Sequence, residues 1–141
     1  MMKKSHFIKL IVSLAAVGAA STAVITALNS GIKAESAADA ADYLATCGLE
    51  VIPTSEKEVT IPTEFGAVYE RYNALQKAQG FDLSAHRGHS AVSYTFTVVG
   101  RTDTEAHVLV CDGKIVAGDV ASTRLDGEMT GLKGERVDEE K

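Results

Sequence analysis

The sequence predicts an α+β fold in which one apolar N-terminal helix precedes a small antiparallel sheet packed against one or two helices. Three observations predict it. Residues 10–28 carry no charged side chain, the hydrophobic period changes from 3.6 to 2 residues in the C-terminal half, and Asp112-Gly113 separates two alternating segments. Strands joined by tight turns pair antiparallel, so we expect the order helix-strand-strand-helix-strand-strand-strand after the N-terminal helix.

The apolar segment 10–28 has the length of a membrane-spanning helix. Its residues, each rising about 1.5 Å, span roughly 28 Å, close to the roughly 30 Å hydrocarbon core of a bilayer. Lys3, Lys4 and Lys9 precede the segment, and basic flanks are typical of the cytoplasmic side. We therefore expect an uncleaved signal anchor in a bacterial cytoplasmic membrane, with residues 1–9 inside the cell and the rest of the chain outside.

A cleaved signal peptide is the alternative interpretation of this segment. Small-x-small triplets such as Gly18-Ala19-Ala20 resemble cleavage sites, and cleavage there would release a secreted protein. The segment is longer than the usual apolar region of about 7–15 residues, and it continues beyond these triplets to Leu28. The uncleaved anchor is therefore the preferred prediction.

The chain beyond the apolar segment is acidic. All 19 acidic residues lie after Asn29, and three of the 14 basic residues precede it, so this part holds 11 positive against 19 negative charges, a net charge of −8. Such a surface repels nucleic acid, and we expect no nucleic-acid partner. We expect a linker at 29–35, one extracytoplasmic α+β domain at 36–132 and a flexible charged tail at 133–141.

The first half of the domain predicts a helix and two short strands. Residues 36–47 form the helix, because Ser36 is a favoured N-cap and Gly48 is a favoured stop. Residues 49–52 and 58–61 are short apolar segments that end at prolines, which predicts two strands joined by a turn.

A second helix is expected at 63–79, with Gly80 at its end. Its two faces differ in polarity, and the less polar face is expected to pack on the sheet. That face consists of Phe65, Val68, Tyr69, Tyr72, Leu75, Gln76 and Gln79, and the solvent face consists of Glu70, Arg71, Asn73 and Lys77.

The second half of the domain predicts three strands. Segments 105–111 and 114–120 flank Asp112-Gly113, a pair that favours a type I′ hairpin turn because both positions need positive φ. The first of the three strands is a half-buried one, with period-2 alternation. Its buried residues are expected to be Val92, Tyr94, Phe96 and Val98.

Two stretches of the domain carry a distinctive combination of motifs: VTIPTEFGAVYERYNALQKAQGFDLSAHRG and, after a strand, LVCDGKIVAGDVASTRLDGEMTGL. Together they resemble an uncharacterised bacterial family catalogued as domain of unknown function 4830, over roughly residues 42–132. Proteins of this kind typically have one N-terminal apolar segment, in agreement with the predicted anchor. The resemblance implies placement and fold, and it supplies no activity and no catalytic residue. Leu49, where a large aromatic residue is expected after Gly48, affects only local packing.

The densest polar cluster is His86-Arg87-Gly88-His89. Arg87 beside a titrating histidine is suited to bind an anion or a carboxylate. A zinc site needs at least three protein ligands, and only two histidines lie close together here, so no metal and no cofactor is predicted. The alternative is a solvated turn in which Arg87 pairs with a helix carboxylate such as Glu70.

Cys47 and Cys111 are the only cysteines. Outside the membrane they form either a disulfide or two buried free thiols, and the sequence leaves both options open. His107 shares a strand face with Cys111, but four residues along a strand separate them by roughly 13 Å, which excludes a nucleophile–base pair. Another histidine can still approach Cys111 through the fold.

Carboxylates lie together after the hairpin, at Asp119 and Asp126. They allow acid–base chemistry, although Gly118 is more typical of a bulge or a close backbone approach and Asp126-Gly127 of a turn. No serine-nucleophile elbow, phosphate-binding glycine loop or metal-protease helix is present in the sequence.

We therefore expect a membrane-anchored extracytoplasmic binding or regulatory module whose partner is an envelope protein or peptide. Its candidate ligand-binding residues are His86, Arg87, His89 and Asp119. One alternative is an envelope hydrolase or transferase that uses the His86–His89 loop with Asp119 or Asp126. Another is a structural subunit of a membrane complex, with the segment 10–28 making the contact.

Overall fold

The computed structural model describes residues 31–137, which form two helices, one 3-10 turn and six strands in one sheet. The predicted anchor at 10–28 lies outside the described residues. No helix between residues 31 and 137 has the length and apolar character needed to cross a membrane. The elements are β1 (Ile32–Lys33), α2 (Ala37–Thr46), β2 (Val51–Thr60), α3 (Ala67–Ala78), η1 (Leu83–His86), β3 (Ser90–Val98), β4 (Thr104–Cys111), β5 (Lys114–Ser122) and β6 (Met129–Thr130).

The strands form an antiparallel sheet in the order β1-β5-β4-β3-β2, with β6 also paired to β5. The β4–β5 hairpin turns at Asp112 and Gly113, whose φ angles are 52° and 74°. Positive φ at both positions is what a type I′ turn requires, so the predicted hairpin is confirmed. The α+β class and the antiparallel sheet are likewise confirmed.

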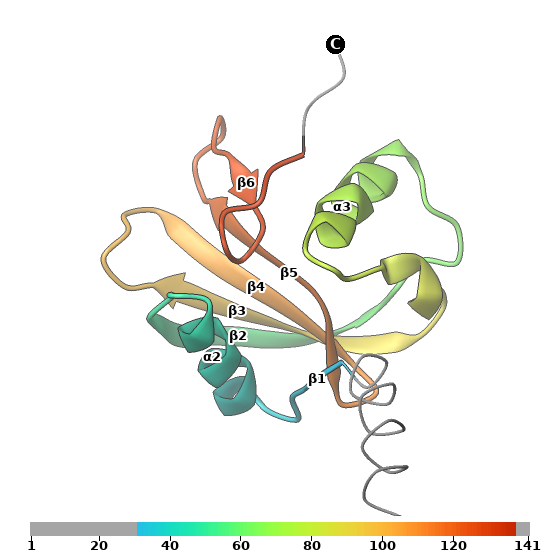
Figure 1. The fold of residues 1–141 in the computed structure, drawn as a ribbon, viewed down its shortest axis with the longest axis horizontal. Coiled ribbons are helices and arrows are strands. Elements are labelled where there is room, and N and C mark those ends of the chain that lie inside the picture. Colours follow the sequence, from blue (N-terminus) through green and yellow to red (C-terminus); the bar gives the residue numbers. More distant parts are fainter. Residues whose placement is uncertain (1–30, 138–141) are drawn as a thin grey trace, which may run out of the picture. The chain divides into compact units, whose positions relative to one another are not determined.

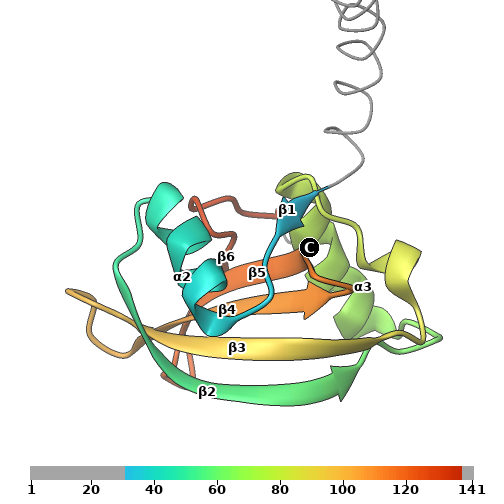
Figure 2. The same cartoon turned by 90° about the horizontal axis from the view of Figure 1, so that it is seen from below.

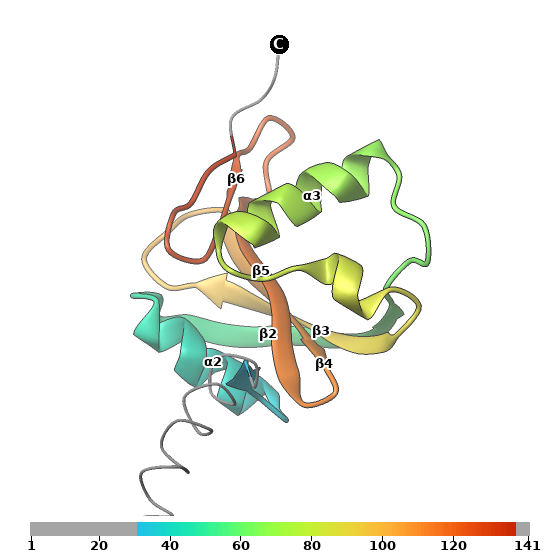
Figure 3. The same ribbon diagram turned by 45° about the vertical axis from the view of Figure 1, so that its right-hand side comes forward.

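Two hydrophobic clusters lie on opposite faces of this sheet. Figures 1 and 3 show the two helices, α2 and α3, lying apart against the sheet. Alternation along β4 separates the two clusters, because Val108 and Val110 belong to the cluster under α2, while Leu109 and Cys111 pack in the cluster on the α3 side. Each helix thus covers its own face of the sheet, and Cys111, on the α3 side, is the residue of β4 that contributes to the candidate site.

The helix α2 agrees with its prediction. Ser36 is the N-cap and its side chain accepts a hydrogen bond from the Asp39 amide, while Gly48, with φ of 84°, follows the helix end. Ala40 and Leu44 are fully buried against the sheet. Local capping signals therefore predicted this element correctly.

The two strands predicted at 49–52 and 58–61 are wrong: a single strand, β2, spans the whole interval. Pro53 lies inside β2, beside a register shift between Pro53 and Ser55. The strand tolerates a proline because it is the edge of the sheet and pairs only with β3, so a missing amide donor can face solvent. The tertiary position of β2 thus outweighs the proline signal.

The helix α3 begins at Ala67, four residues later than predicted, with Gly66 as its N-cap. Its buried face also differs from the prediction. Val68 is 81% exposed, whereas Asn73 is buried. Asn73 is buried because its amide is fully used: it donates to Asp82 and accepts from the Leu83 amide, which ties η1 to the helix (2.9 and 2.7 Å).

Both ends of the described chain pack on the domain. In the segment expected as a linker, Ile32 and Lys33 form β1 and Ala34 is buried. At the other end, Leu132 is buried, and the Gly131 amide donates to the Glu135 carbonyl (2.8 Å). The part of the predicted tail that the structure describes, residues 133–137, therefore includes a hydrogen-bonded turn.

Candidate metal centre

Three potential metal ligands meet at one corner of the domain: His86, His89 and Cys111. Their ligand atoms all lie within 4.8 Å of one another. The thiol is buried, His86 is half-buried and His89 is exposed, so the group is open to solvent on one side. We call these three residues the histidine–cysteine corner.

The two histidines are held by the turn that follows η1. His86 ends η1, and its carbonyl accepts a hydrogen bond from the His89 amide (3.1 Å). The Gly88 amide donates to the Ile61 carbonyl, and the Ile61 amide donates to the His89 carbonyl (2.8 and 2.9 Å). Gly88 has φ of 77°, a backbone conformation that favours glycine at this turn. The loop is therefore fixed by backbone bonds on both sides of Arg87.

The start of η1 is fixed as firmly. Asp82 caps it by accepting hydrogen bonds from the Ser84 amide and hydroxyl (2.9 and 2.6 Å), and Asn73 donates to the same carboxylate. These donors, led by Asn73, lower the pKa of Asp82 to about 2. His86 therefore projects from a turn anchored to α3.

The register of β3 against β4 brings His89 to Cys111. Val92 lies opposite Val110, so continuing the antiparallel pairing by one residue sets Ala91 beside Cys111. His89 precedes that pair by two residues. The resulting distance from the Cys111 Sγ to the His89 Nδ1 is 3.9 Å.

Asp112 supplies a carboxylate at the edge of the corner. Its Oδ2 lies 3.8 Å from the Cys111 Sγ and 3.8 Å from the His89 Nδ1. The Asp112 side chain is 82% exposed, so it has room to rotate toward a bound cation. Asp112 is thus the natural fourth ligand, with water as the alternative.

The spacing of the three ligand atoms is close to that of a zinc site. Nitrogen about 2.0–2.1 Å and sulfur about 2.3 Å from a tetrahedral zinc ion lie roughly 3.5 Å apart. The 3.9 Å between Cys111 and His89 exceeds this by a few tenths of an ångström, and the 4.8 Å limit of the group exceeds it by about 1 Å. Closing that gap requires the half-buried His86 and the exposed His89 to rotate toward the ion.

Burial, and secondarily the Asp112 carboxylate, raises the pKa of the Cys111 thiol. A neutral thiol beside a carboxylate is a poor nucleophile at neutral pH. A bound cation reverses both effects, because it favours the thiolate and neutralises Asp112. The electrostatics of the corner therefore suit a metal better than they suit covalent catalysis.

The other sequence candidates lie outside the corner. Arg87 turns away from it: its guanidinium is 3.8 Å from Glu70 and 4.4 Å from the centre of the Phe65 ring. The ion pair with Glu70 confirms the alternative considered for this loop. Arg87 is therefore committed to α3 and to the segment before it.

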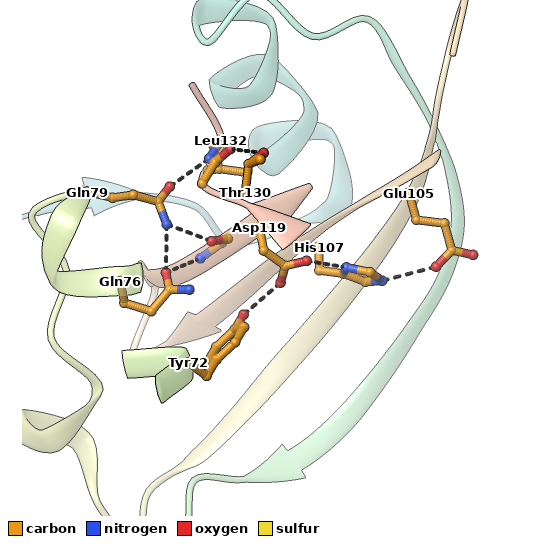
Figure 4. Close-up of polar contacts among 10 residues, drawn as sticks. Tyr72, Gln76, Gln79, Glu105, His107, Asp119, Thr130 and Leu132 are labelled. Carbon is orange, nitrogen blue, oxygen red and sulfur yellow. Dashed lines mark hydrogen bonds and ion pairs between the residues drawn. The ribbon is translucent and has the colours of Figure 1, made fainter. Parts of the chain in front are cut away.

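Asp119 is buried within a different set of contacts (Figure 4). One carboxylate oxygen of Asp119 accepts a hydrogen bond from the Tyr72 hydroxyl (2.7 Å), and the other pairs with His107 Nδ1 (2.8 Å). The second ring nitrogen of His107, Nε2, lies 3.1 Å from the Glu105 carboxylate. These bonds form a continuous chain, which we call the Tyr72–Glu105 chain. Asp119 thus does not join His86, Arg87 and His89 in one site.

His107, at the centre of the Tyr72–Glu105 chain, has no free ring nitrogen. Both ring nitrogens of His107 contact carboxylates, and these contacts, led by the hydrogen bond that His107 donates to Asp119, raise the pKa of His107. Burial, followed by the charge of Asp119, raises the pKa of Tyr72. The chain therefore attaches α3 to β4 and β5 through Asp119, with both ring nitrogens of His107 engaged.

Two glutamines complete the attachment of α3 to β5 (Figure 4). Gln76 accepts from the Gly118 amide, and Gln79 donates to the Gly118 carbonyl (both 2.8 Å). Gln79 also accepts from the Leu132 amide (2.7 Å). A Cβ at position 118 would lie 2.6 Å from Leu132 Cδ1, so the glycine makes room for a packed side chain, where the sequence predicted a bulge or a close backbone approach.

Asp126, the other carboxylate of the enzymatic alternative, lines an open pocket of about 570 Å³ with Arg101 and Arg124. None of the three corner residues lines that pocket. Both cysteines are free thiols: Cys47 packs with the cluster on the α2 side and Cys111 with the cluster on the α3 side. The sheet therefore separates the two. Both are free, as in the second option left open for the cysteines, but only Cys111 is buried and Cys47 is half-buried.

Sequence reasoning missed the corner because its third ligand, Cys111, lies 22 residues after His89. No metal was predicted, since a cluster of two histidines falls short of a site, and the fold supplies the missing donor. The usable signal was the strand periodicity, which places Cys111 on the same face as His107 but cannot give the register with β3.

Comparison of the chain with protein-family models, with curated proteins and with solved structures gives no match. The resemblance to domain of unknown function 4830 stays a prediction.

Proposed function

We propose that this protein is a transition-metal-binding module, presented outside the cytoplasmic membrane on its N-terminal anchor. The observation that supports it is the convergence of His86, His89 and Cys111, with ligand atoms within 4.8 Å of one another at an open corner. This is a more specific form of the binding role predicted from the sequence.

The donor types favour zinc. Two imidazoles and a thiolate suit zinc and copper, whereas magnesium and calcium prefer oxygen ligands. Three protein ligands leave one position for Asp112 or for water, and Asp112 already lies 3.8 Å from both Cys111 and His89. Zinc is also redox-inert, so it does not oxidise the thiol that binds it.

Binding is favoured over catalysis because the polar groups near α3 are already used. His107 and Asp119 are saturated by each other and by their neighbours, and Arg87 pairs with Glu70. Between residues 31 and 137, the corner is the group in which three potential metal ligands lie together, held only by long contacts of 3.8 to 3.9 Å. We therefore propose reversible metal binding, in exchange with solvent on the open side of His89.

The test is zinc affinity of the full chain in detergent micelles, followed by cobalt substitution. Cys111→Ser and His89→Ala are each expected to weaken zinc binding by at least about 100-fold, more than the loss of an outer-shell partner typically costs. Bound cobalt should show a sulfur-to-cobalt charge-transfer band that Cys111→Ser removes.

Two variants serve as matched controls. Cys47→Ser removes the other free thiol, on the far face of the sheet, and His107→Gln removes a histidine of the Tyr72–Glu105 chain. Both are expected to bind zinc as the unaltered chain does. Equal zinc affinity in Cys111→Ser and in the unaltered chain would refute the proposed site.

Placement outside the membrane is tested separately. A C-terminal tag is expected to be digested by protease added to intact spheroplasts, with the chain still in the membrane fraction. Protection of the tag until lysis would contradict the proposed orientation, and recovery of a soluble mature chain would replace the anchor by a cleaved signal peptide.

A further inference from the structure

The strand β1 attaches to the hairpin turn that follows Cys111. The Ala34 amide donates to the Gly113 carbonyl (2.9 Å), Lys33 pairs with Lys114, and Ile32 pairs with Ile115. Figures 1 and 2 show β1 beside the hairpin end of β5. Gly113, whose carbonyl binds the Ala34 amide, is thus only two residues along the chain from the proposed metal ligand Cys111.

We infer that occupancy of the histidine–cysteine corner and pairing of β1 with β5 are coupled, so that a bound metal ion holds β1 on the sheet. This inference rests on the proposed metal site. In the sequence, β1 is the first structural element after the apolar segment 10–28. Metal binding would therefore regulate how firmly the domain holds the end of its own anchor.

The strand β1 has the features of a two-state element. It is two residues long and pairs only with β5, so few bonds hold it, and short edge elements open at low free-energy cost. Lys33 lies opposite Lys114, and like charges in directly opposite positions destabilise a pair. Its attachment depends mainly on the packing of Ile32 and Ala34.

The coupling runs through the hairpin turn. A metal ion bound by Cys111 and Asp112 fixes the residues immediately before Gly113, whose carbonyl is the acceptor for Ala34. Conversely, release of β1 removes the neighbour of the buried Ile115 and leaves β5 as a free edge at the hairpin end. An opened hairpin end displaces Cys111, so binding and pairing favour each other reciprocally.

The first measurement is amide hydrogen exchange of residues 32–34 in the full chain in micelles, with zinc and without it. Zinc is expected to slow exchange of the Ala34 amide by roughly five-fold or more, the lower end of typical coupling between sites. Amides in the centre of β4, such as that of Val108, provide the internal reference. The zinc effect at Ala34 should vanish in Cys111→Ser.

The reciprocal measurement uses proline substitution. Ala34→Pro removes the donor to Gly113 and is expected to weaken zinc affinity roughly five-fold or more. Ala37→Pro is the matched control, because Ala37 is the first residue of α2, where proline is favoured, and Ser36 before it is already extended. If Ala34→Pro does not fold, Ile32→Ser, which loosens β1 without proline, replaces it.

The two proposals fail in different ways. If the unaltered chain does not bind zinc, or binds it without Cys111, the metal site itself is refuted. If zinc binds through Cys111 but exchange at Ala34 is unchanged, and the β1 variant binds zinc as Ala37→Pro does, the site stands and the coupling is refuted. Slowed exchange together with weakened binding in the β1 variant supports both.

Discussion

The histidine–cysteine corner and the Tyr72–Glu105 chain lie at different positions along the same face of β4, yet they have opposite chemistry. In the chain, Asp119 satisfies both Tyr72 and His107, and His107 has no free ring nitrogen. In the corner, the three ligand atoms lie within 4.8 Å of one another, and Cys111 Sγ lies 3.9 Å from His89 Nδ1, so no strong bond joins them. The difference shows that the role of a histidine depends on whether carboxylates already bond to its ring nitrogens, and not on the residue type.

The largest expected effect tests the structural role of the chain. Asp119→Ala leaves the buried Tyr72 hydroxyl and one nitrogen of His107 without their partner, and we expect a loss of about 3 kcal/mol in the free energy of unfolding. Urea denaturation measures it. Zinc affinity should be unchanged in the folded variant, and a large loss of zinc binding would contradict the separation of the two regions.

The next effect concerns the contact between Gly118 of β5 and Leu132, which belongs to the cluster on the α2 side. Gly118→Ala places a methyl group 2.6 Å from Leu132 Cδ1, so we expect destabilisation by about 2 kcal/mol, typical of an overpacked site. Pairing it with Leu132→Ala makes room for the methyl group. If the double variant is no more stable than the summed free-energy losses of the two single variants predict, steric contact with Leu132 does not cause the destabilisation of Gly118→Ala.

The pH dependence of stability separates the two regions more finely. Contacts with Asp119 and Glu105 raise the pKa of His107 in the folded state. The protonated imidazole therefore stabilises the fold fully below the unfolded pKa of about 6.5, and this stabilisation is lost as the pH rises through the folded pKa. We expect thermal stability to fall over that interval in the unaltered chain. The fall should be reduced in His107→Gln and retained in His89→Ala.

Zinc affinity should change with pH in the opposite direction. Burial raises the pKa of Cys111, and the metal binds the thiolate, so binding releases a proton and strengthens as the pH rises. Zinc titrations in buffers of increasing pH measure this trend. Affinity that is independent of pH would indicate that the thiol is not a ligand.

The smallest effect is expected at Arg87, between the two histidines. Its ion pair with Glu70 joins side chains that are 44% and 56% exposed, and solvent screens such pairs. Together with the contact to Phe65, the loss in Arg87→Ala should be at most about 1 kcal/mol. Zinc affinity should stay the same, and a strong decrease would place Arg87 in the site.

Local signals predicted much of the fold, and they failed where tertiary position decides. Ser36 and Gly48 delimited α2 correctly, and Asp112-Gly113 gave the hairpin. Pro53 wrongly ended a strand, because only the sheet order makes β2 an edge that accepts it. Asn73 was wrongly assigned to solvent, because its partner Asp82 joins it only through the fold.

The candidate site was predictable in part. His86 and His89 were singled out as a polar pair in one loop, and the pairing of Arg87 with Glu70 was anticipated. Asp119 was grouped with them, but it belongs to the Tyr72–Glu105 chain. The predicted group of His86, Arg87, His89 and Asp119 lacked Cys111, because the spacing of residues in the sequence gives no distance between strands.

The sequence by itself determined the turns, the caps and the alternation of buried and exposed residues, because each depends on backbone preferences and burial over a few neighbouring positions. Only the tertiary structure decided that Cys111 meets His86 and His89, because that contact depends on the register of β4 against β3 and on the turn held by Ile61. Strand register is a property of pairs of segments, so the convergence of these three ligands is set by contacts that no single segment encodes.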